Sequence, residues 1–241
     1  SKGLYYLEGH PLHNKDTIEI RYMTAKDEDI LTSMTLLKKG LAIDRLLQNI
    51  IVSKSINIDD LLVGDKNAIL VAARITGYGA DYDAQVKCPI CNSTVDYSFD
   101  LSNIETKGII DFQSWNVTAT TNKTFIIHLD KSNSDIEFRL LTGKDEKKLS
   151  ESMESKRKRN LPESNLTDQL RMMIVSVNGN TDPNYINSFI NNMPALDSKI
   201  LRKTYQELVP NVDMSQEFVC SNCNFEGEVD VPFGATFFWP K

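Results

Sequence analysis

The chain has 241 residues, of which 41% are hydrophobic and 25% are charged, with a formal net charge of −6 and a pI near 5.2. This composition indicates a folded globular protein and excludes a fibrous repeat or intrinsic disorder. Broad nucleic-acid binding needs a basic face, so the acidic balance argues against it.

The N-terminal end is apolar but shows no targeting signal. No apolar run in the chain approaches the roughly 20 residues that span a bilayer, and the first six residues lack the pattern of a signal peptide. We therefore expect a soluble protein that stays in the cytoplasm of a cell and contacts no membrane.

The N-terminal segment contains two candidate functional features. Tyr5 and Tyr6 are predicted to contact a partner protein. His10 and His13 flank Pro11, and we interpret them as part of an exposed loop in preference to a metal chelate.

Residues 18–53 predict a strand followed by two helices. Thr24 is a predicted N-cap, and Asp27 occupies the third helical position, where it completes a capping box. The first helix is predicted to end at Gly40; the residues that it is predicted to bury are Ile30, Leu31, Met34 and Leu37. The second is predicted to end near Ser53; its apolar stripe comprises Ile43, Leu46, Leu47, Ile50 and Ile51. A third helix over roughly 65–76 is predicted to be closed by Gly77.

The four cysteines form two C-x-x-C pairs, Cys88 with Cys91 and Cys220 with Cys223, and none is left over. Short strands are predicted on both sides of each pair, as in the two hairpins of a zinc ribbon. Each C-x-x-C turn can aim two thiolates at one cation, and two turns complete a closed tetrahedral shell without a catalytic vacancy. The sequence therefore predicts one structural Zn²⁺ bound by all four cysteines.

Three other interpretations of the cysteines stay open: two disulfides, a thioredoxin-like redox pair, or an iron–sulfur cluster. Disulfides are typical of secreted chains, and redox motifs occur singly at the start of a helix, whereas zinc accounts for both pairs equally. The sequence does not separate zinc from iron in the cell. The 128 residues between Cys91 and Cys220 predict that a whole domain lies between the two pairs.

An internal repeat relates residues 18–28 to residues 136–146, which share seven of eleven residues without a gap. The second copy has the same predicted strand, with Thr142 as N-cap and Asp145 at the third helical position. A later helix is predicted to end near Gly179; its apolar residues are Leu170, Met173, Ile174 and Val177. We infer a tandem duplication and predict an α+β fold of two strand-plus-helices halves joined by a shared Cys₄ zinc ribbon.

The predicted boundaries are an N-terminal half at 1–102, a linker or hairpin at 103–125, and a C-terminal half at 126–241 that ends in an aromatic tail. Phe237, Phe238 and Trp239 of this tail are predicted to be buried against the chain's own ribbon or to dock into a neighbouring subunit. The basic cluster at 156–159 is interpreted as the solvated end of a helix, the alternative being contact with phosphate or an acidic partner.

No motif of a familiar catalytic site occurs in the sequence. There is no G-x-S-x-G elbow, P-loop or G-x-G-x-x-G segment. The acidic pairs at 27–28 and 145–146 are explained by helix capping and by the helix macrodipole. We therefore expect neither enzymatic activity nor a small-molecule substrate.

Several segments in combination resemble the T4-type bacteriophage base-plate protein family: residues 1–6, 18–31, 60–65 (DLLVGD) and 75–79 (ITGYG), followed by the two cysteine pairs. The resemblance covers nearly the whole chain. It implies a structural or assembly role in the baseplate hub of a contractile-tailed phage, with other tail and hub proteins as partners. It also implies a location in the virion, and in the host cytoplasm during assembly.

The residues and the resemblance together predict a noncatalytic zinc-ribbon subunit of the baseplate hub that docks other tail proteins. Two alternatives stay open. One is a transient hub-assembly factor or chaperone that is absent from the mature virion. The other is a nucleic-acid-binding zinc-ribbon accessory protein, which would use the ribbon and the basic cluster at 156–159.

Overall fold

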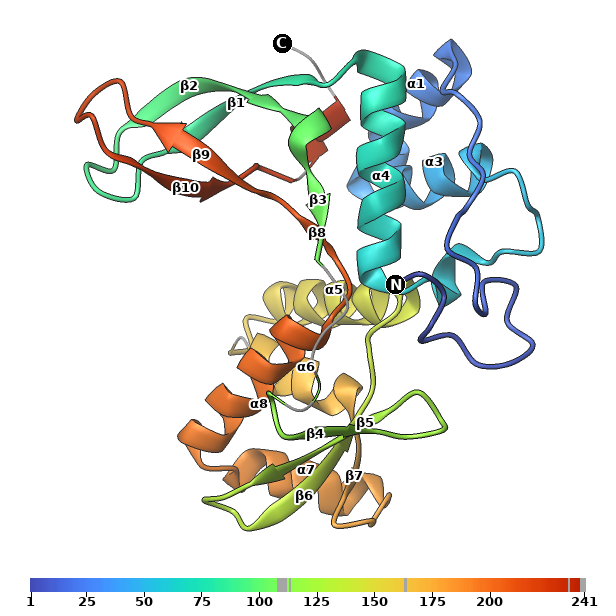
Figure 1. Ribbon diagram of the computed structural model, residues 1–241, viewed down its shortest axis with the longest axis vertical. Helices are drawn as coiled ribbons and strands as arrows, with labels where there is room; N and C mark the ends of the chain where they lie inside the picture. The colour runs from blue at the N-terminus through green and yellow to red at the C-terminus, as the bar shows by residue number, and fades with distance from the viewer. Residues whose placement is uncertain (108–111, 113, 163, 234, 239–241) are drawn as a thin grey trace. The chain divides into compact units, whose positions relative to one another are not determined.

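The computed structural model describes residues 1–107, 112, 114–162, 164–233 and 235–238 (Figure 1). It has the predicted α+β fold and divides into two compact units whose segments alternate along the chain. Unit 1 comprises Ser1–Thr17, Asp59–Gly64 and Gly108–Pro210, and unit 2 comprises Ile18–Ile58, Asp65–Lys107 and Asn211–Lys241. Each unit draws on both predicted sequence halves, so the division into halves stays a prediction about the origin of the chain.

Unit 2 contains three short helices and most of a long one: α1 (Ala25–Thr32), α2 (Met34–Lys38), α3 (Ala42–Ile50) and α4 (Val63–Tyr78). The strand that was predicted before the first helix is not formed, and the segment makes a single antiparallel bridge between Ile20 and Ile51 instead. The helix that was expected to run to Gly40 is interrupted at Ser33, whose extended backbone (φ −64°, ψ 105°) separates α1 from α2. The prediction that Met34 is buried is therefore wrong, since its side chain is 65% exposed. The apolar stripe of α3 is confirmed, with Leu46, Leu47 and Ile50 fully buried.

The helix α4 also differs from the sequence-based expectation at its end. It continues through Gly77 to Tyr78, and the glycine with a left-handed backbone is Gly79 (φ 87°). Gly77 serves a packing role instead, because a Cβ atom there would lie 3.2 Å from Sδ of Met23. The first glycine of the pair therefore permits close packing, and the second terminates the helix.

The strands described in unit 2 form two-stranded antiparallel sheets: β1 (Asp81–Lys87) with β2 (Thr94–Asp100), β9 (Ser215–Val219) with β10 (Glu226–Asp230), and β3 (Glu105–Thr106) with β8 (Val212–Asp213). The first two pairs are the predicted ribbon hairpins, and the short β3–β8 pair lies where the chain leaves unit 2 and returns to it. Short 3₁₀ helices complete the unit and its borders: η1 (Ile58–Asp60), η2 (Leu101–Asn103) and η3 (Ala235–Phe238).

Aromatic side chains join the two ribbon hairpins, which lie side by side in Figure 1. Tyr97 of β2 packs against Phe218 of β9, with ring centroids 5.1 Å apart. Tyr82 of β1 packs against Phe99 and donates a hydrogen bond to the carbonyl of Pro232. Because side chains alternate along a strand, these aromatics face inward while the acidic residues between them face solvent.

The C-terminal segment is held in unit 2 by a buried arginine. Phe237 and Phe238 are buried, and the carbonyl of Phe237 accepts a hydrogen bond from Nε of Arg74 at 3.0 Å. The other nitrogens of this guanidinium donate to the carbonyls of Gly79 and Asp81, at 2.9 and 3.0 Å. Arg74 is only 2% exposed, so one side chain links α4, β1 and the tail through backbone oxygens.

Unit 1 is built on a four-stranded antiparallel sheet in the order β4 (Val117–Ala119), β5 (Phe125–Leu129), β6 (Ser134–Phe138) and β7 (Ile174–Val177). Its helices are α5 (Gly143–Lys158), α6 (Asn165–Met173), α7 (Pro183–Asn192) and α8 (Ala195–Leu208). Phe125 and Phe138 are buried on adjacent strands, with ring centroids 5.6 Å apart. Phe138 also lies 6.3 Å from the ring of Tyr205, so α8 packs against the same core.

The helix that was predicted to end near Gly179 ends at Met173, and the prediction is wrong for residues 174–177. These residues form β7, which pairs with β6 in register Ile136 with Val177 and Phe138 with Ile174. Three of the four residues are β-branched, which favours a strand on a half-buried sheet. The apolar spacing alone did not distinguish a helical stripe from a short buried strand.

One polar network occurs at the start of both α1 and α5. Arg21 donates to both carboxylate oxygens of Asp27 at 2.7 and 2.9 Å, and Asp27 accepts from the amide and hydroxyl of Thr24, both at 2.9 Å. The second copy repeats every contact at 2.7 to 3.0 Å through Arg139, Thr142 and Asp145. The two predicted capping boxes are therefore present, and each is closed by an arginine from the preceding segment.

No helix in the described part of the chain has the length and apolar character needed to cross a bilayer.

Candidate metal centre

Each cysteine pair lies in the turn of a ribbon hairpin, and the two turns have the same backbone geometry. The amide of Cys88 donates to the carbonyl of Ser93 at 2.9 Å, and the amide of Asn92 donates to the carbonyl of Cys88 at 3.0 Å. The second turn repeats both bonds at 2.9 Å with Cys220, Asn224 and Phe225. Asn92 and Asn224 have φ values of 58° and 54°, a left-handed conformation that asparagine adopts more readily than most residues.

The two turns bring the four sulfur atoms together, all within 4.8 Å of one another. Sγ of Cys88 lies 3.7 Å from Sγ of Cys223, and Sγ of Cys91 lies 3.8 Å from Sγ of Cys220. In a tetrahedral site with Zn–S bonds of about 2.3 Å, neighbouring sulfurs are about 3.8 Å apart. The four cysteines therefore fit one four-coordinate cation.

The same geometry weighs against the other interpretations of the cysteines. Disulfide sulfurs are about 2.05 Å apart, whereas all four cysteines here are free thiols. A redox-active pair is typically placed at a helix N-terminus, whereas both pairs here lie in turns between strands. Four thiolates in a tetrahedron suit zinc or iron.

Two polar side chains adjoin the sulfur cluster. The hydroxyl of Ser93 lies 2.8 Å from Sγ of Cys91, and the amide of Asn222 donates to the same sulfur at 3.7 Å. Hydrogen bonds from the hydroxyl and the backbone amide of Ser93, and from Asn222, lower the pKa of Cys91 to about 5. These donors therefore stabilise a thiolate, the form that binds a metal.

The pKa of Cys223 is shifted in the opposite direction to that of Cys91. The backbone amide of Phe225 acts to lower the pKa of Cys223, but desolvation and the neighbouring thiols outweigh it and raise this pKa to about 12. Several thiolates this close repel one another, because each disfavours ionisation of the next. A divalent cation removes this repulsion, so the donor set is suited to a bound metal.

The structure places the other predicted site residues within the chain's own units. Tyr6 is buried in unit 1, where its ring stacks on His10 at 4.3 Å and its carbonyl lies 2.7 Å from Nδ1 of His13. Tyr5 lies 5.8 Å from the ring of Phe125. Burial raises the pKa of Tyr5. Binding of a partner through these tyrosines stays a prediction.

The aromatic tail follows the first of its two predicted alternatives, since Phe237 packs against Tyr82 of the ribbon with ring centroids 5.1 Å apart. Phe237 and Phe238 are 1% and 2% exposed. Contact of either residue with a partner stays a prediction, and Trp239 lies outside the described residues.

Sequence reasoning missed three residues that shape this region: Ser93, Asn222 and Arg74. Ser93 and Asn222 lie beside or within a C-x-x-C turn, but the spacing of the cysteines does not reveal which neighbour donates to which sulfur. Arg74 occurs on an otherwise apolar stretch of α4, and a lone basic residue in such a stretch was the available signal.

The fold and the site define an α+β protein in which two C-x-x-C hairpins, far apart in sequence, converge on a candidate metal centre. The sequence profile described as T4 bacteriophage base plate protein matches residues 5–239, so the chain belongs to this family. Membership supports a structural role in the phage baseplate, in the virion tail, with other tail proteins as partners. No curated protein and no solved structure was found to match the chain.

Proposed function

We propose that the chain is a noncatalytic subunit of the baseplate hub of a contractile-tailed phage and that one structural zinc ion holds its ribbon together. The observation that carries this proposal is the convergence of four thiols within 4.8 Å in a chain of the base plate protein family. The ligands are Cys88, Cys91, Cys220 and Cys223.

The proposed role of the zinc is structural because the donor set leaves no open position. A catalytic zinc site has three protein ligands and a water, whereas four thiolates fill the tetrahedral shell. Cys88 and Cys220 are fully buried, and the turns that carry them are fixed by backbone hydrogen bonds. A bound ion therefore supplies stability to the ribbon, since the free energy of metal binding adds to that of folding.

The path of the chain explains why the ribbon needs this stabilisation in the proposed role. The first hairpin ends at Asp100 and the second begins at Ser215, and most of the intervening chain belongs to unit 1. Closing so long a loop has an entropic cost, which the aromatic contacts between the hairpins and the proposed metal offset. We propose that the zinc holds both ends of the unit 1 insertion in the same ribbon, so that the chain presents fixed surfaces to other tail proteins.

The two copies of the capped helix start, with its arginine, support the proposed duplication. The side-chain contacts among arginine, threonine and aspartate follow the same pattern in both copies. The hydrogen bond made by the backbone amide of each arginine also matches. The amide of Arg21 donates to the carbonyl of Ile50, and that of Arg139 donates to the carbonyl of Met173, both at 2.9 Å. We propose that the sequence halves arose from one ancestral unit; a comparison of the two segments that found unrelated Cα paths would contradict this.

The metal is tested by measuring the zinc, iron and free thiols of protein purified without chelator. We expect one zinc per chain and protection of all four thiols from a thiol reagent until a chelator is added. The matched variants are Cys223→Ser, which removes a ligand, and Ser221→Ala, which changes the same turn without removing one. Absence of metal from the wild type, or bound iron, would contradict the zinc assignment.

The role in the particle is tested by purifying mature virions and isolated baseplates from a phage that encodes a tagged copy of the chain. Mass spectrometry of both samples is expected to detect the chain, and cross-linking is expected to join it to other hub proteins. Detection only in assembly intermediates would replace this proposal with the alternative of a transient assembly factor.

A further inference from the structure

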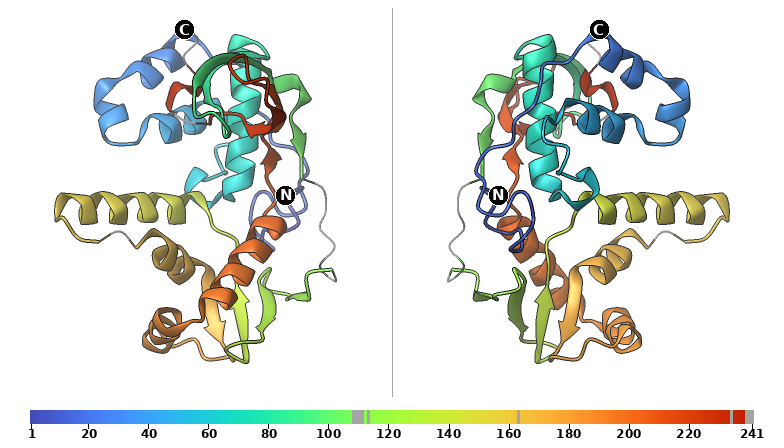
Figure 2. Two further views of the ribbon diagram at one scale, coloured as in Figure 1. Left: turned by 90° about the vertical axis from the view of Figure 1, so that its left-hand side faces the viewer. Right: turned by 90° about the vertical axis from the view of Figure 1, so that its right-hand side faces the viewer.

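The helix α5 is much longer than its counterpart in the repeat. Both α1 and α5 begin with the same capped turn, but α1 has 8 residues and α5 has 16. After its first turn, α5 contains no buried residue, and Figure 2 shows its C-terminal half, in yellow, extending away from the sheet of unit 1. The added two turns therefore contribute little to the core of unit 1.

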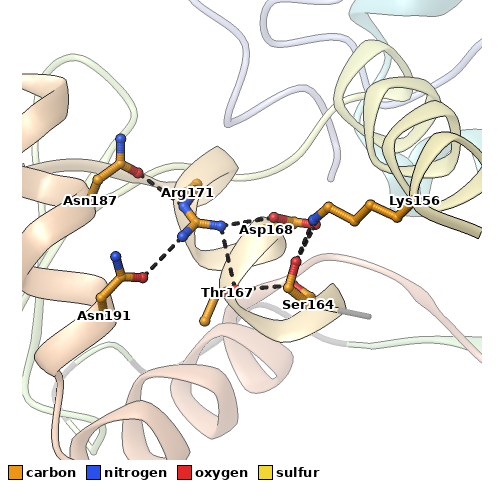
Figure 3. A network of polar contacts seen from close by, with 7 residues as sticks. All are labelled: Lys156, Ser164, Thr167, Asp168, Arg171, Asn187 and Asn191. Atoms are coloured by element: carbon orange, nitrogen blue, oxygen red, sulfur yellow. Dashed lines mark hydrogen bonds and ion pairs between the residues drawn. The ribbon is translucent and has the colours of Figure 1, made fainter. Parts of the chain in front are cut away.

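A polar network nevertheless fixes the end of α5 (Figure 3). Lys156 binds the carboxylate of Asp168 and the hydroxyl of Ser164. Arg171 donates to the other oxygen of Asp168 at 2.9 Å, and to two residues of α7, Asn187 and Asn191, at 3.0 Å each. Because Asp168 is buried and is held from both sides, this network orients the end of α5 relative to α6 and α7.

The surface held in this way, which we call the basic tip, consists of Met153, Arg157, Lys158, Arg159 and Leu161. All five side chains are exposed, with Met153 and Leu161 at 45% and 51%. Arg157 and Arg159 form no ion pair within the described part of the chain, and Lys158 pairs only with the exposed Glu154. The tip thus combines apolar side chains with cations whose charge is not neutralised by a buried carboxylate.

A surface of opposite character lies on the outer side of the β9–β10 hairpin. This acidic face consists of Glu217, Val219, Glu226, Glu228 and Asp230, all exposed. Glu217 lies directly opposite Glu228 in the antiparallel register, and Glu226 lies opposite Val219, which is 50% exposed. Like charges directly opposite one another destabilise a sheet, so this arrangement is unfavourable unless cations approach it.

The two ribbon hairpins, one of which carries the acidic face, account for the net negative charge of the protein. The two ribbon hairpins, residues 81–100 and 215–230, contain eight acidic residues and one lysine, whereas the entire chain has a net charge of −6. The rest of the chain is therefore close to neutral and slightly basic.

We propose that the basic tip of one copy of this chain binds the acidic face of a second copy. Three cations of the tip match four carboxylates of the face, and exposed apolar side chains lie among these charges, two on the tip and Val219 on the face. The cations would relieve the repulsion between Glu217 and Glu228. Since the two surfaces differ, the contact is head-to-tail, and repetition of it generates a closed ring or an open chain of copies.

The proposal is tested by measuring the mass of the intact protein by light scattering and sedimentation over a range of concentrations at low and high salt. We expect association at about 50 mM salt that weakens strongly near 500 mM, because screening shortens the reach of exposed charges. In the tip variant, Arg157, Lys158 and Arg159 are each changed to Glu. In the face variant, Glu226, Glu228 and Asp230 are each changed to Lys.

Each variant alone is expected to lose at least about tenfold in association constant, because like charges then face one another. A mixture of the two variants, and the chain that carries both sets of changes, are expected to recover association. The matched control changes Lys144, Lys147 and Lys148 to Glu, which alters the same helix by the same charge near its other end and should leave association unchanged.

Monomeric wild type at every concentration in low salt would overturn the proposal, as would association that survives both variants or fails to return in the mixture. Binding of the tip to a nucleic-acid duplex without self-association would also overturn it. The metal content of each variant is measured in the same samples, so a failure of the zinc assignment and a failure of this contact give separate results.

Discussion

The two compact units reach stability by different routes. Unit 1 contains a four-stranded sheet with buried phenylalanines on β5 and β6 and with α8 packed against them. The ribbon of unit 2 consists of two-stranded hairpins, a size of sheet that is marginal in water by itself. A few aromatic contacts and four converging thiols connect these hairpins. The comparison indicates that the ribbon, whose sheets are too small to form a core of their own, depends on the contacts between its two hairpins.

Both units contain the same capped helix start with its arginine, so they also provide an internal control. An effect that depends on the local element should appear equally in both units. One that depends on the ribbon should appear only in unit 2.

Removal of a metal ligand should produce the largest difference in stability between the two units. In Cys223→Ser, or in wild type treated with chelator, we expect the melting temperature to fall by more than about 10 °C. Hydrogen exchange should become fast at residues 81–100 and 215–230 and stay slow in β5, β6 and β7. Ser221→Ala is the control and should behave as wild type. Equal loss of protection in both units would refute a ribbon-specific role for the cysteines.

The buried guanidinium of Arg74 should have the next largest effect, confined to unit 2. Arg74→Met leaves the carbonyls of Gly79, Asp81 and Phe237 without their charged donor, and we expect a loss of about 3 kcal/mol in the free energy of unfolding. Arg74→Lys should recover only part of this loss, because one ammonium group cannot reproduce the fork of three donors. Denaturant titration measures both variants; a loss below about 1 kcal/mol would show that the tail is not held by this residue.

The repeated aspartates allow a matched comparison between units. Asp27 accepts one bond more than Asp145, from the side-chain amide of Asn49 at 2.9 Å. We expect Asp27→Asn to cost about 2 kcal/mol and Asp145→Asn about 1 kcal/mol, values kept small because each arginine partner is more than a third exposed. Asn49→Ala should reduce the difference between the two variants. Equal costs in the presence of Asn49 would contradict this explanation.

These aspartates should also make stability depend on pH. Hydrogen bonds from Arg21 and Thr24 lower the pKa of Asp27. Burial acts to raise the pKa of Asp145, but hydrogen bonds from Arg139 and Thr142 outweigh burial and lower it. A lowered folded-state pKa gives stability above the unfolded pKa of about 4, and this stability is lost as the pH falls further. The difference between wild type and each Asn variant should therefore shrink below about pH 4.

The smallest effect is expected at the end of α5. Lys156→Met removes one of the two cations that hold Asp168, and we expect a loss of about 0.5–1 kcal/mol because the lysine side chain is partly exposed. Lys158→Ala removes only a solvent-exposed pair with Glu154 and should not change stability measurably. If both variants lost the same stability, the network in Figure 3 would not be what fixes α5.

Local features of the structure could be predicted from the sequence because they depend on near neighbours. The two capping boxes follow from a threonine and an aspartate three residues apart. The ribbon strands follow from alternating residues on either side of each C-x-x-C pair, and they form with the expected pairing. The convergence of the four cysteines was predictable because two matched C-x-x-C pairs together supply the four ligands of one tetrahedral cation.

Features that depend on the pairing of distant segments were not predictable in the same way. Residues 174–177 had the apolar spacing of a helix, but β6 offered a hydrogen-bonding edge and they became a strand. Met34 had helical spacing with Leu31, but the break at Ser33 turned it to solvent. The backbone partners of Arg74 come from segments as far apart as Gly79 and Phe237, and no local pattern connects them.

Short spacings and recognisable motifs in the sequence are sufficient to predict the capping boxes, the ribbon hairpins, the four candidate ligands and the family. The folded chain alone reveals which sulfur lies beside which, where the tail is buried, and how the segments of the chain are divided between two units. These outcomes depend on contacts between residues more than a hundred positions apart. Their free energy arises from packing and desolvation in the folded chain, not from any local preference.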